Sequence, residues 1–176
     1  MSTIALTPTS YVVLGCLATG GPATPYDLKQ AVTDGVGYFW TFPHSQLYSE
    51  PARLAQAGLV AERREDVGRR RRVFSITDAG RQALEDWLAD PMADLPEIRD
   101  TGLLKLFFAD NTEPEHVVAL ARRQSELHRQ RLKLYEALSE VAGDGTAAAT
   151  LGLGLAWEKA ATVFWAGVSE NPPAHP

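Results

Sequence analysis

Apolar residues recur every three or four positions in three stretches of the first sixty residues, and helix-start signals precede these stretches. Thr7-Pro8 and Thr24-Pro25 each place an N-capping threonine before a proline at the first helical position, and Asp27 adds a capping-box carboxylate to the second start. Glycines follow the stretches as stop signals. The pattern therefore predicts helices over about residues 7–20, 24–34 and 43–58.

The pattern changes to alternation after Gly58. The segments LVAERRE and RRVFSIT each alternate side chains between two faces, and Asp66-Val67-Gly68 has turn chemistry between them, which predicts a β-hairpin. Thr77-Asp78 then caps a fourth helix that Pro91 ends. Three helices, a hairpin and a fourth helix are the order of a winged helix-turn-helix module, whose third helix enters the DNA major groove while the hairpin lies along the backbone or the minor groove.

The rest of the chain has helical periodicity. A helix is predicted over residues 97–109, a capping box at Thr112-Glu113-Pro114-Glu115 opens a long helix over 113–142, and an alanine- and glycine-rich helix follows over 146–169. The segment PMADLP marks a domain boundary. We therefore expect a mainly α fold: a winged helix-turn-helix DNA-binding domain with a two-stranded wing at 1–90, and a helical dimerisation domain, also the candidate effector-binding domain, at 91–176.

Charge is distributed unevenly in a chain whose formal net charge is -5. Between Arg63 and Arg72, six arginines face only two carboxylates, Glu65 and Asp66, which leaves a local balance of +4. The overall acidity excludes a protein that binds nucleic acid over most of its surface. It permits a small basic patch, in which guanidinium groups on the wing meet phosphates. The alternative is that these arginines only guard an exposed strand edge against aggregation.

Composition indicates the cellular compartment and argues against catalytic or metal sites. No apolar run approaches the ~20 residues of a membrane span, no basic residue precedes the first apolar stretch, and there is a single cysteine, Cys16, so we expect a cytoplasmic protein without a membrane partner. The four histidines are scattered without metal-ligand spacing, and Gly152-x-Gly154 lies inside a helical pattern. These observations argue against an enzyme and predict neither a cofactor nor a bound metal.

Five segments together resemble the PadR family of bacterial transcriptional regulators. They are SYVVLGCLATGGPATPYDLKQAV, HSQLYSEPARLAQAGLV and GRRRRVFSITDAGRQALEDWL, followed by LLKLFFAD and LGLGLAWEKAATVFWAGV, which are similar to the helical second half of the subgroup with a short C-terminal domain. The resemblance covers about residues 4–169. Its most specific element is an ordered series: Tyr11 to Gly15, Tyr48, Leu54, Gly58-Leu59 and the motif Phe74-x-Ile76-Thr77-x-x-Gly80.

The resemblance implies a homodimer that pairs through its C-terminal helices, binds a palindromic double-stranded DNA operator as a repressor and, as in many members, responds to a small molecule. It also implies packing or phosphate contact for Tyr48, and backbone contacts for Tyr26 and Lys29. The chain departs from the family at Pro51, where an apolar helix former is more common. A proline inside a helix costs about 3 kcal/mol unless the chain bends, so we expect a kink near residues 47–51.

Residue type and position define three candidate sites. Polar side chains on the third helix suit base edges or phosphates, and wing arginines suit phosphates. The candidate DNA-binding residues are Tyr26, Lys29, His44, Ser45, Gln46, Tyr48, Ser49, Arg53, Arg69, Arg70, Arg71 and Arg72. The candidate dimerisation residues are Tyr11, Val12, Leu134, Leu138, Leu155, Val163 and Trp165. The candidate contacts of a small aromatic effector are Phe107, Phe108, His128, Tyr135, Trp157 and Phe164.

Simpler interpretations stay open at this point. The polar side chains of the third helix could be only its solvent face, and the aromatic residues could be only core. The alternative function is an effector-free helical protein-interaction module with no enzymatic activity. The wing next to the third helix favours DNA binding over that alternative.

Overall fold

The computed structural model describes residues 4–40, 43–64 and 71–173, and it divides into two compact units, Met1–Asp94 and Leu95–Pro176. Among the described residues, no helix combines the length and the apolar character needed to cross a membrane.

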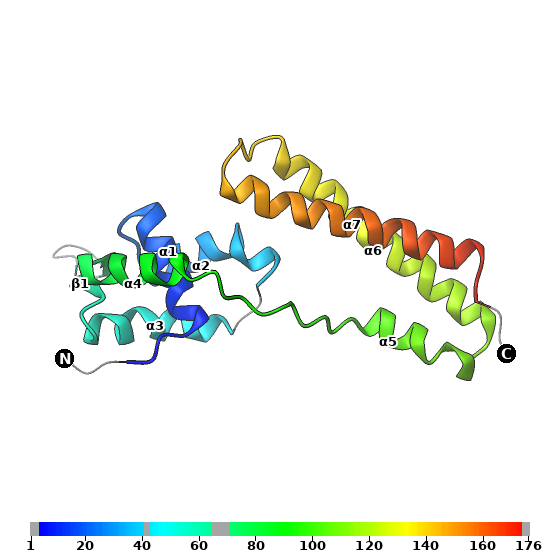
Figure 1. Cartoon of the computed structure of the whole chain (residues 1–176), viewed down its shortest axis with the longest axis horizontal. Helices are drawn as coiled ribbons and strands as arrows, with labels where there is room; N and C mark the ends of the chain where they lie inside the picture. The colour runs from blue at the N-terminus through cyan, green and yellow to red at the C-terminus, as the bar shows by residue number, and fades with distance from the viewer. Residues whose placement is uncertain (1–3, 41–42, 65–70, 174–176) are drawn as a thin grey trace. The chain divides into compact units, whose positions relative to one another are not determined.

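The N-terminal unit has the element order of a winged helix-turn-helix module, which confirms the predicted fold (Figure 1). Its elements are α1 (Pro8–Gly20), α2 (Pro25–Thr33), the 3-10 turn η1 (Val36–Tyr38), α3 (His44–Gln56), β1 (Val60–Arg64), β2 (Arg72–Ile76) and α4 (Asp78–Ala89). The strands pair antiparallel, with Val60 opposite Ile76 and Arg64 opposite Arg72. The predicted turn at residues 66–68 lies outside the described residues.

Hydrogen bonds at the first turns confirm the predicted starts of α1 and α2. The Asp27 N–H donates to Thr24 Oγ1 at 3.3 Å, and the Asp27 carboxylate accepts from the Thr24 N–H at 3.0 Å, which completes the capping box. At α1, the Thr7 N–H donates to Ser10 Oγ at 2.8 Å. Local capping therefore sets where both helices begin.

The core of this unit joins its helices to the wing. Leu14 of α1, Leu28 of α2, Leu47 and Leu54 of α3 and Phe74 of β2 are all buried in one cluster. The residue Ala23 between α1 and α2 also exchanges two backbone hydrogen bonds with Phe74, each 2.9 Å long. This bridge, which the sequence did not predict, fixes the base of the wing against the first two helices.

A tight corner explains the spacing Thr77-x-x-Gly80. Thr77 Oγ1 donates to the Gly58 carbonyl at 2.8 Å and accepts from the Gly80 N–H at 3.1 Å, so one hydroxyl both caps α4 and holds the end of α3. Gly58 has φ 78, the left-handed conformation that favours glycine at a helix end. A Cβ on Gly80 would lie 2.1 Å from the Leu59 carbonyl oxygen, so only glycine fits there.

The helix α3 continues through Pro51 without a break in its assignment, and the proline ring is fully buried. Pro51 lies on the same side of the helix as Leu47 and Leu54, which face the core. The ring therefore contributes apolar surface to the core. The kink expected from the sequence stays a prediction.

The C-terminal unit consists of α5 (Thr101–Phe107), the 3-10 turn η2 (Ala109–Asn111), α6 (Pro114–Ser139) and α7 (Thr146–Glu170). The helices α6 and α7 pack against each other along their length (Figure 1). The ring of Tyr135 is buried against Gly154, where a Cβ would lie 2.9 Å from the ring. Gly154 therefore allows close helix packing, which is the role expected for a glycine inside an apolar helix.

Two predicted helix boundaries and one predicted capping box in this unit were wrong. The first helix begins at Thr101 rather than 97, because the Asp100 carboxylate caps the N–H groups of Gly102 and Leu103 at 2.6 and 3.2 Å. The predicted capping box at Thr112 does not form: Glu113 precedes α6, and Thr112 Oγ1 bonds His116 Nδ1 at 2.8 Å. The helix α6 ends at Ser139 rather than 142.

Replacing Gly80 with alanine should lower the free energy of unfolding by about 1–3 kcal/mol, because the new methyl group would overlap a backbone oxygen. Gly15→Ala is the matched control, since a Cβ there meets nothing within 4 Å and alanine is favoured over glycine inside a helix by about 1 kcal/mol. Urea unfolding followed by circular dichroism measures both variants. Equal stability of the two would contradict the role assigned to this corner.

Candidate nucleic-acid interface

The outward face of α3 is polar and uncharged. With a period of 3.6 residues, Leu47, Glu50, Pro51 and Leu54 point inward and are buried. The opposite row carries Ser45, Ser49 and Gln56, and all three are exposed. Ser49 Oγ lies 3.4 Å from the carbonyls of Ser45 and Gln46, which are weak contacts that leave the hydroxyl able to turn. Gln56 was missed in the sequence, although its spacing of seven from Ser49 places it on the same row.

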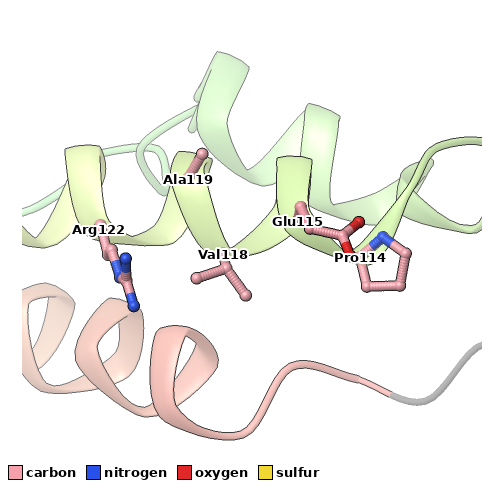
Figure 2. Close-up of a pocket in the computed structure, with 5 residues that line it drawn as sticks. All are labelled: Pro114, Glu115, Val118, Ala119 and Arg122. Atoms are coloured by element: carbon pink, nitrogen blue, oxygen red, sulfur yellow. The ribbon is translucent and has the colours of Figure 1, made fainter.

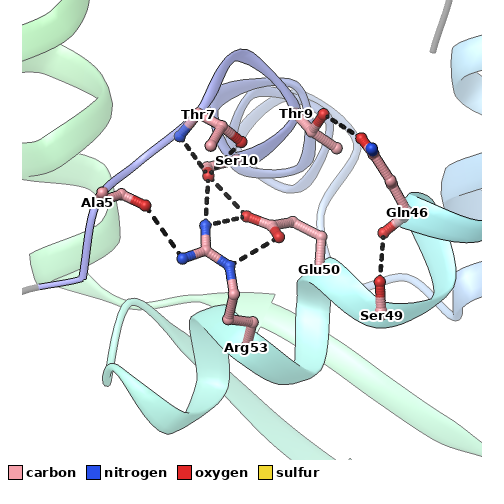
Figure 3. Close-up of polar contacts among 8 residues, drawn as sticks. All are labelled: Ala5, Thr7, Thr9, Ser10, Gln46, Ser49, Glu50 and Arg53. Carbon is pink, nitrogen blue, oxygen red and sulfur yellow. Dashed lines mark hydrogen bonds and ion pairs between the residues drawn. The ribbon is translucent and has the colours of Figure 1, made fainter. Parts of the chain in front are cut away.

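Gln46 and Tyr48 border this row on opposite sides, and both are exposed. Thr9 Oγ1 of α1 donates to Gln46 Oε1 at 2.9 Å, so the amide is held from the side of α1 (Figure 3). On α2, Tyr26 is exposed and Lys29 is half-buried. His44, the remaining candidate on α3, is the first residue of the helix.

Arg53 is occupied inside the protein. Its guanidinium donates to both carboxylate oxygens of Glu50 at 2.9 and 2.6 Å, to Ser10 Oγ at 2.9 Å and to the Ala5 carbonyl at 3.0 Å (Figure 3). Ser10 Oγ in turn donates to Glu50 Oε1 at 2.6 Å. The structure therefore uses Arg53 to tie α3 to α1, which residue type alone did not reveal.

The same contacts govern the charge of Glu50, which is only 8% exposed. Burial alone would raise the pKa of its carboxyl, but the hydrogen bonds from Arg53 and Ser10 and the positive charge of Arg53 prevail and lower that pKa. Glu50 in turn raises the pKa of Arg53. Glu50 is the single acid in the sequence of α3, so the outward row of this helix carries no carboxylate.

On the wing, Arg72 forms a bidentate pair with Glu62. Its Nε and Nη2 each donate to a different Glu62 oxygen at 2.7 Å, and its guanidinium lies 5.1 Å from the centre of the Phe74 ring. The hydrogen bond from Arg72 lowers the pKa of Glu62. Arg71 is exposed. The pKa of Asp27 at the start of α2 is lowered by hydrogen bonds from the backbone and side chain of Thr24, and to a smaller extent by the positive charge of Arg71. The other two wing candidates, Arg69 and Arg70, lie outside the described residues.

The candidate dimerisation residues differ in exposure. Val163 is 70% exposed and Leu134 is also exposed, whereas Val12, Leu138 and Leu155 are half-buried. The ring of Tyr11 stacks on Trp87 of α4 at 4.4 Å within the same unit. Trp165 is only 1% exposed in the single chain, and its role as a dimerisation residue stays a prediction.

The candidate effector residues have different surroundings in the single chain, and their role as contacts of one effector stays a prediction. His128 Nδ1 lies 2.6 Å from Glu158 Oε2, and Tyr135 is buried between α6 and α7. Phe107, Trp157 and Phe164 are exposed. Phe108 alone of the six lines a groove of about 590 Å³, whose other lining residues are Leu104, Lys105, Ala109, Thr112, His116, Val117, Leu120 and Arg123.

A smaller hollow of about 320 Å³ lies along the first turns of α6 (Figure 2). It is lined by Pro114, Glu115, Val118, Ala119 and Arg122, none of which was a candidate from the sequence. Across residues 4–40, 43–64 and 71–173, no group of three or more histidine, cysteine, aspartate or glutamate side chains is arranged to hold a metal ion.

Replacing Glu50 with glutamine should lower the free energy of unfolding at pH 7 by about 1–3 kcal/mol, because a hydrogen-bonded charge pair is lost. The pKa of Glu50 is lowered by folding, so its contribution is present above the pKa of the unfolded glutamate, about 4.3, and is lost as the pH falls through the lower folded value. The difference between the wild type and Glu50→Gln should therefore shrink on acidification below about pH 4.

Urea unfolding at a series of pH values measures this difference. Glu126→Gln is the control, because Glu126 is also an acid with a lowered pKa that pairs with an arginine, but it lies on the exposed surface of α6. A pH-independent difference for Glu50→Gln would refute the charge assigned to Glu50.

Two family models match the sequence one after the other. The model of the transcriptional regulator PadR-like family matches residues 13–86, and the model of the virulence activator alpha C-terminal region matches residues 98–166. The chain is also 29% identical over 137 residues to the negative transcriptional regulator PadR of Bacillus subtilis, which is 76% of this chain and 70% of that protein.

Two crystal structures of Bacillus subtilis PadR share the fold. The structure in complex with operator DNA has a TM-score of 0.82 at 23% identity, over 92% of this chain and 96% of the other. The structure in complex with p-coumaric acid has a TM-score of 0.74 at 22% identity, over 94% and 97% of the two chains. Residues 13–86 therefore form a domain of the transcriptional regulator PadR-like family, and the chain shares the fold of the Bacillus subtilis PadR structures.

Proposed function

We propose that the chain is a homodimeric PadR-type repressor whose two N-terminal units bind a palindromic DNA operator. The observation that carries this proposal is the exposed row of Ser45, Ser49 and Gln56 on α3, which is polar and free of carboxylates in a chain of net charge -5. The acid of this helix, Glu50, is turned inward and compensated by Arg53. A surface that approaches phosphates and base edges has to exclude uncompensated carboxylates, because they repel DNA.

The relatives support both the binding partner and the sign of regulation. Bacillus subtilis PadR is named a negative transcriptional regulator and has been solved in complex with operator DNA. A family of transcriptional regulators is not a class of enzymes. We therefore assign residues 1–90 to DNA binding and the helices of residues 91–176 to dimerisation.

We assign different roles to the wing arginines. Arg72 already makes a bidentate pair with Glu62, so its role is to hold β1 and β2 together. Arg71 is exposed and next to it in sequence, and we propose that it contacts phosphates together with Arg69 and Arg70. Such contacts supply affinity that is independent of sequence, while α3 supplies discrimination between operators.

The exposed face of α7 supports the homodimer. Leu153 and Val163 are 75% and 70% exposed, and Trp157 and Phe164 are also exposed on the sides of α7 turned away from α6. Among the residues of α7, only Glu158, Lys159 and Glu170 are charged, and Glu158 is buried against α6. A long apolar helix face of this kind marks an interaction surface, and a second copy would bury it. Leu153 therefore joins Val163 as a proposed contact.

We further propose that a small aromatic effector binds the groove beside Phe108. Its volume of about 590 Å³ lies in the ordinary range for ligand sites, and its lining combines the apolar side chains of Leu104, Phe108 and Leu120 with the cations Lys105 and Arg123. The relative Bacillus subtilis PadR has been solved with p-coumaric acid, an aromatic acid. The groove therefore suits an aromatic ring that carries a negative charge.

Replacing Arg70 and Arg71 with alanine should weaken binding to a selected operator and to random DNA alike. Each phosphate contact that is lost should lower the slope of log affinity against log salt by about 0.9. The probe is a duplex that the wild type selects from a random library, and fluorescence anisotropy over a salt series gives the slope. Arg129→Ala is the control, because Arg129 lies on α6 in the C-terminal unit and pairs with Glu126.

An unchanged affinity and salt slope for the double variant would mean that the arginine run only guards the strand edge. Failure of the wild type to select any duplex would favour the effector-free protein-interaction module instead.

Val163→Arg should convert the dimer into a monomer, because a charge would replace an exposed apolar side chain at the proposed contact. Light scattering should then give twice 19.2 kDa for the wild type and 19.2 kDa for the variant. Lys159→Gln is the control on the same helix, since it leaves the apolar face intact and should stay dimeric. A wild-type protein that is monomeric at micromolar concentration would refute the homodimer.

Replacing Phe108 with alanine should abolish the response to an aromatic acid, because the ring lines the groove. Isothermal titration with p-coumaric acid, paired with operator anisotropy, should show binding and weaker operator affinity for the wild type only. Phe107→Ala is the control: Phe107 is adjacent in sequence, is 79% exposed and does not line the groove. Equal responses of both variants would exclude this groove.

A further inference from the structure

A buried hydroxyl on α1 holds an exposed side chain of α3. Thr9 is the second residue of α1 and is only 8% exposed, and its hydroxyl donates to Gln46 Oε1 at 2.9 Å. Gln46 is exposed in the first turn of α3, beside the outward row of Ser45 and Ser49. Figure 3 shows the Gln46 amide turned toward Thr9 from the neighbouring helix. A buried hydroxyl therefore holds the end of an exposed amide.

This hydrogen bond occupies one end of the amide. A glutamine amide has an oxygen that accepts and an NH2 group that donates two hydrogen bonds, and its last torsion rotates between two similar states. In the structure the oxygen points to α1, where it accepts from Thr9. The NH2 group, for which the described residues provide no partner, is then the end left to donate outward.

Thr9 is itself held in place by the contacts that its neighbour Ser10 makes with the next turn of α3. Ser10, adjacent to Thr9, is fully buried and bonds the Glu50 carboxylate at 2.6 Å, and Arg53 bonds both Ser10 and Glu50. Gln46, Glu50 and Arg53 follow one another at steps of four and three, so they form one row on the side of α3 that meets α1. The contacts of Ser10 with Glu50 and Arg53 thus hold α1 against α3. They also place Thr9 beside Gln46.

We infer that Thr9 is a positioning residue for operator recognition, which fixes the Gln46 amide so that its NH2 group faces acceptor atoms on the base edges of the major groove. This inference rests on the proposed function. Acceptors in that groove are N7 and O6 of guanine, N7 of adenine and O4 of thymine, whereas the amino groups of adenine and cytosine are donors. The arrangement thus selects bases by their acceptors at the position that Gln46 meets.

The test is a double-mutant cycle of Thr9→Val and Gln46→Ala. Valine has nearly the shape of threonine but no hydroxyl, and Thr9→Ser is the matched control that keeps it. The probe is a duplex selected by the wild type from a random library, compared with a shuffled duplex of the same composition. The readout is the ratio of the two affinities, because a loss of packing alone would lower both.

Gln46→Ala should lower this ratio roughly 5- to 150-fold, and Thr9→Val should lower it about two- to tenfold while Thr9→Ser leaves it unchanged. Thr9→Val should have no further effect once Gln46 is alanine. A new selection with Thr9→Val should also show a relaxed preference at one base position in each half-site. Circular dichroism checks folding, and Thr9→Ala removes the same hydroxyl with less bulk if the valine variant does not fold.

Three outcomes would overturn the inference while leaving DNA binding intact. They are a wild-type ratio for Thr9→Val, an equal loss from Thr9→Val with and without Gln46, and a wild-type ratio for Gln46→Ala. Failure of the wild-type protein to select any duplex is a different result, because it removes the proposed function and this inference with it.

Discussion

The ion pair between Glu50 and Arg53 is the interaction on which the proposed recognition surface depends. A buried carboxylate is costly unless a charge and hydrogen bonds compensate it, and here Arg53 and Ser10 provide both. The same contacts bind α3 to α1, remove a negative charge from the outward face and occupy an arginine that would otherwise be available to DNA. The outward row of the helix keeps neutral donors and acceptors, so in the proposed complex the positive charges that meet DNA would come from the wing.

Most of the fold could be predicted because its signals are local. Thr24 and Asp27 form the expected capping box, and Gly58 ends α3 in the left-handed conformation that glycine favours. The errors arose where another hydrogen bond replaced the one that the local sequence suggested. At the start of α6, Thr112 resembled a cap, but its hydroxyl bonds His116 instead. At α5, Asp100 caps the helix later than periodicity alone indicated.

The candidate sites were less predictable, because residue type does not reveal partners that are distant in sequence. Arg53 is suited to phosphate by type, yet its guanidinium is bound by Ser10 of another helix. Arg72 meets Glu62 diagonally across the hairpin, a pair that follows only from the strand register. On α7, apolar residues occur on nearly every side, so periodicity could not tell buried Trp165 from exposed Leu153.

The exposed apolar face of α7 gives the two units different kinds of stability. The N-terminal unit surrounds its own core of leucines and Phe74, so its free energy of unfolding belongs to the single chain. The C-terminal unit leaves Leu153 and Val163 exposed, and in a dimer their burial would follow mass action. Its apparent melting temperature would then rise with protein concentration, while that of the N-terminal unit would stay constant. The number of copies in a cell would thereby set how much of the protein is assembled to act on two half-sites at once.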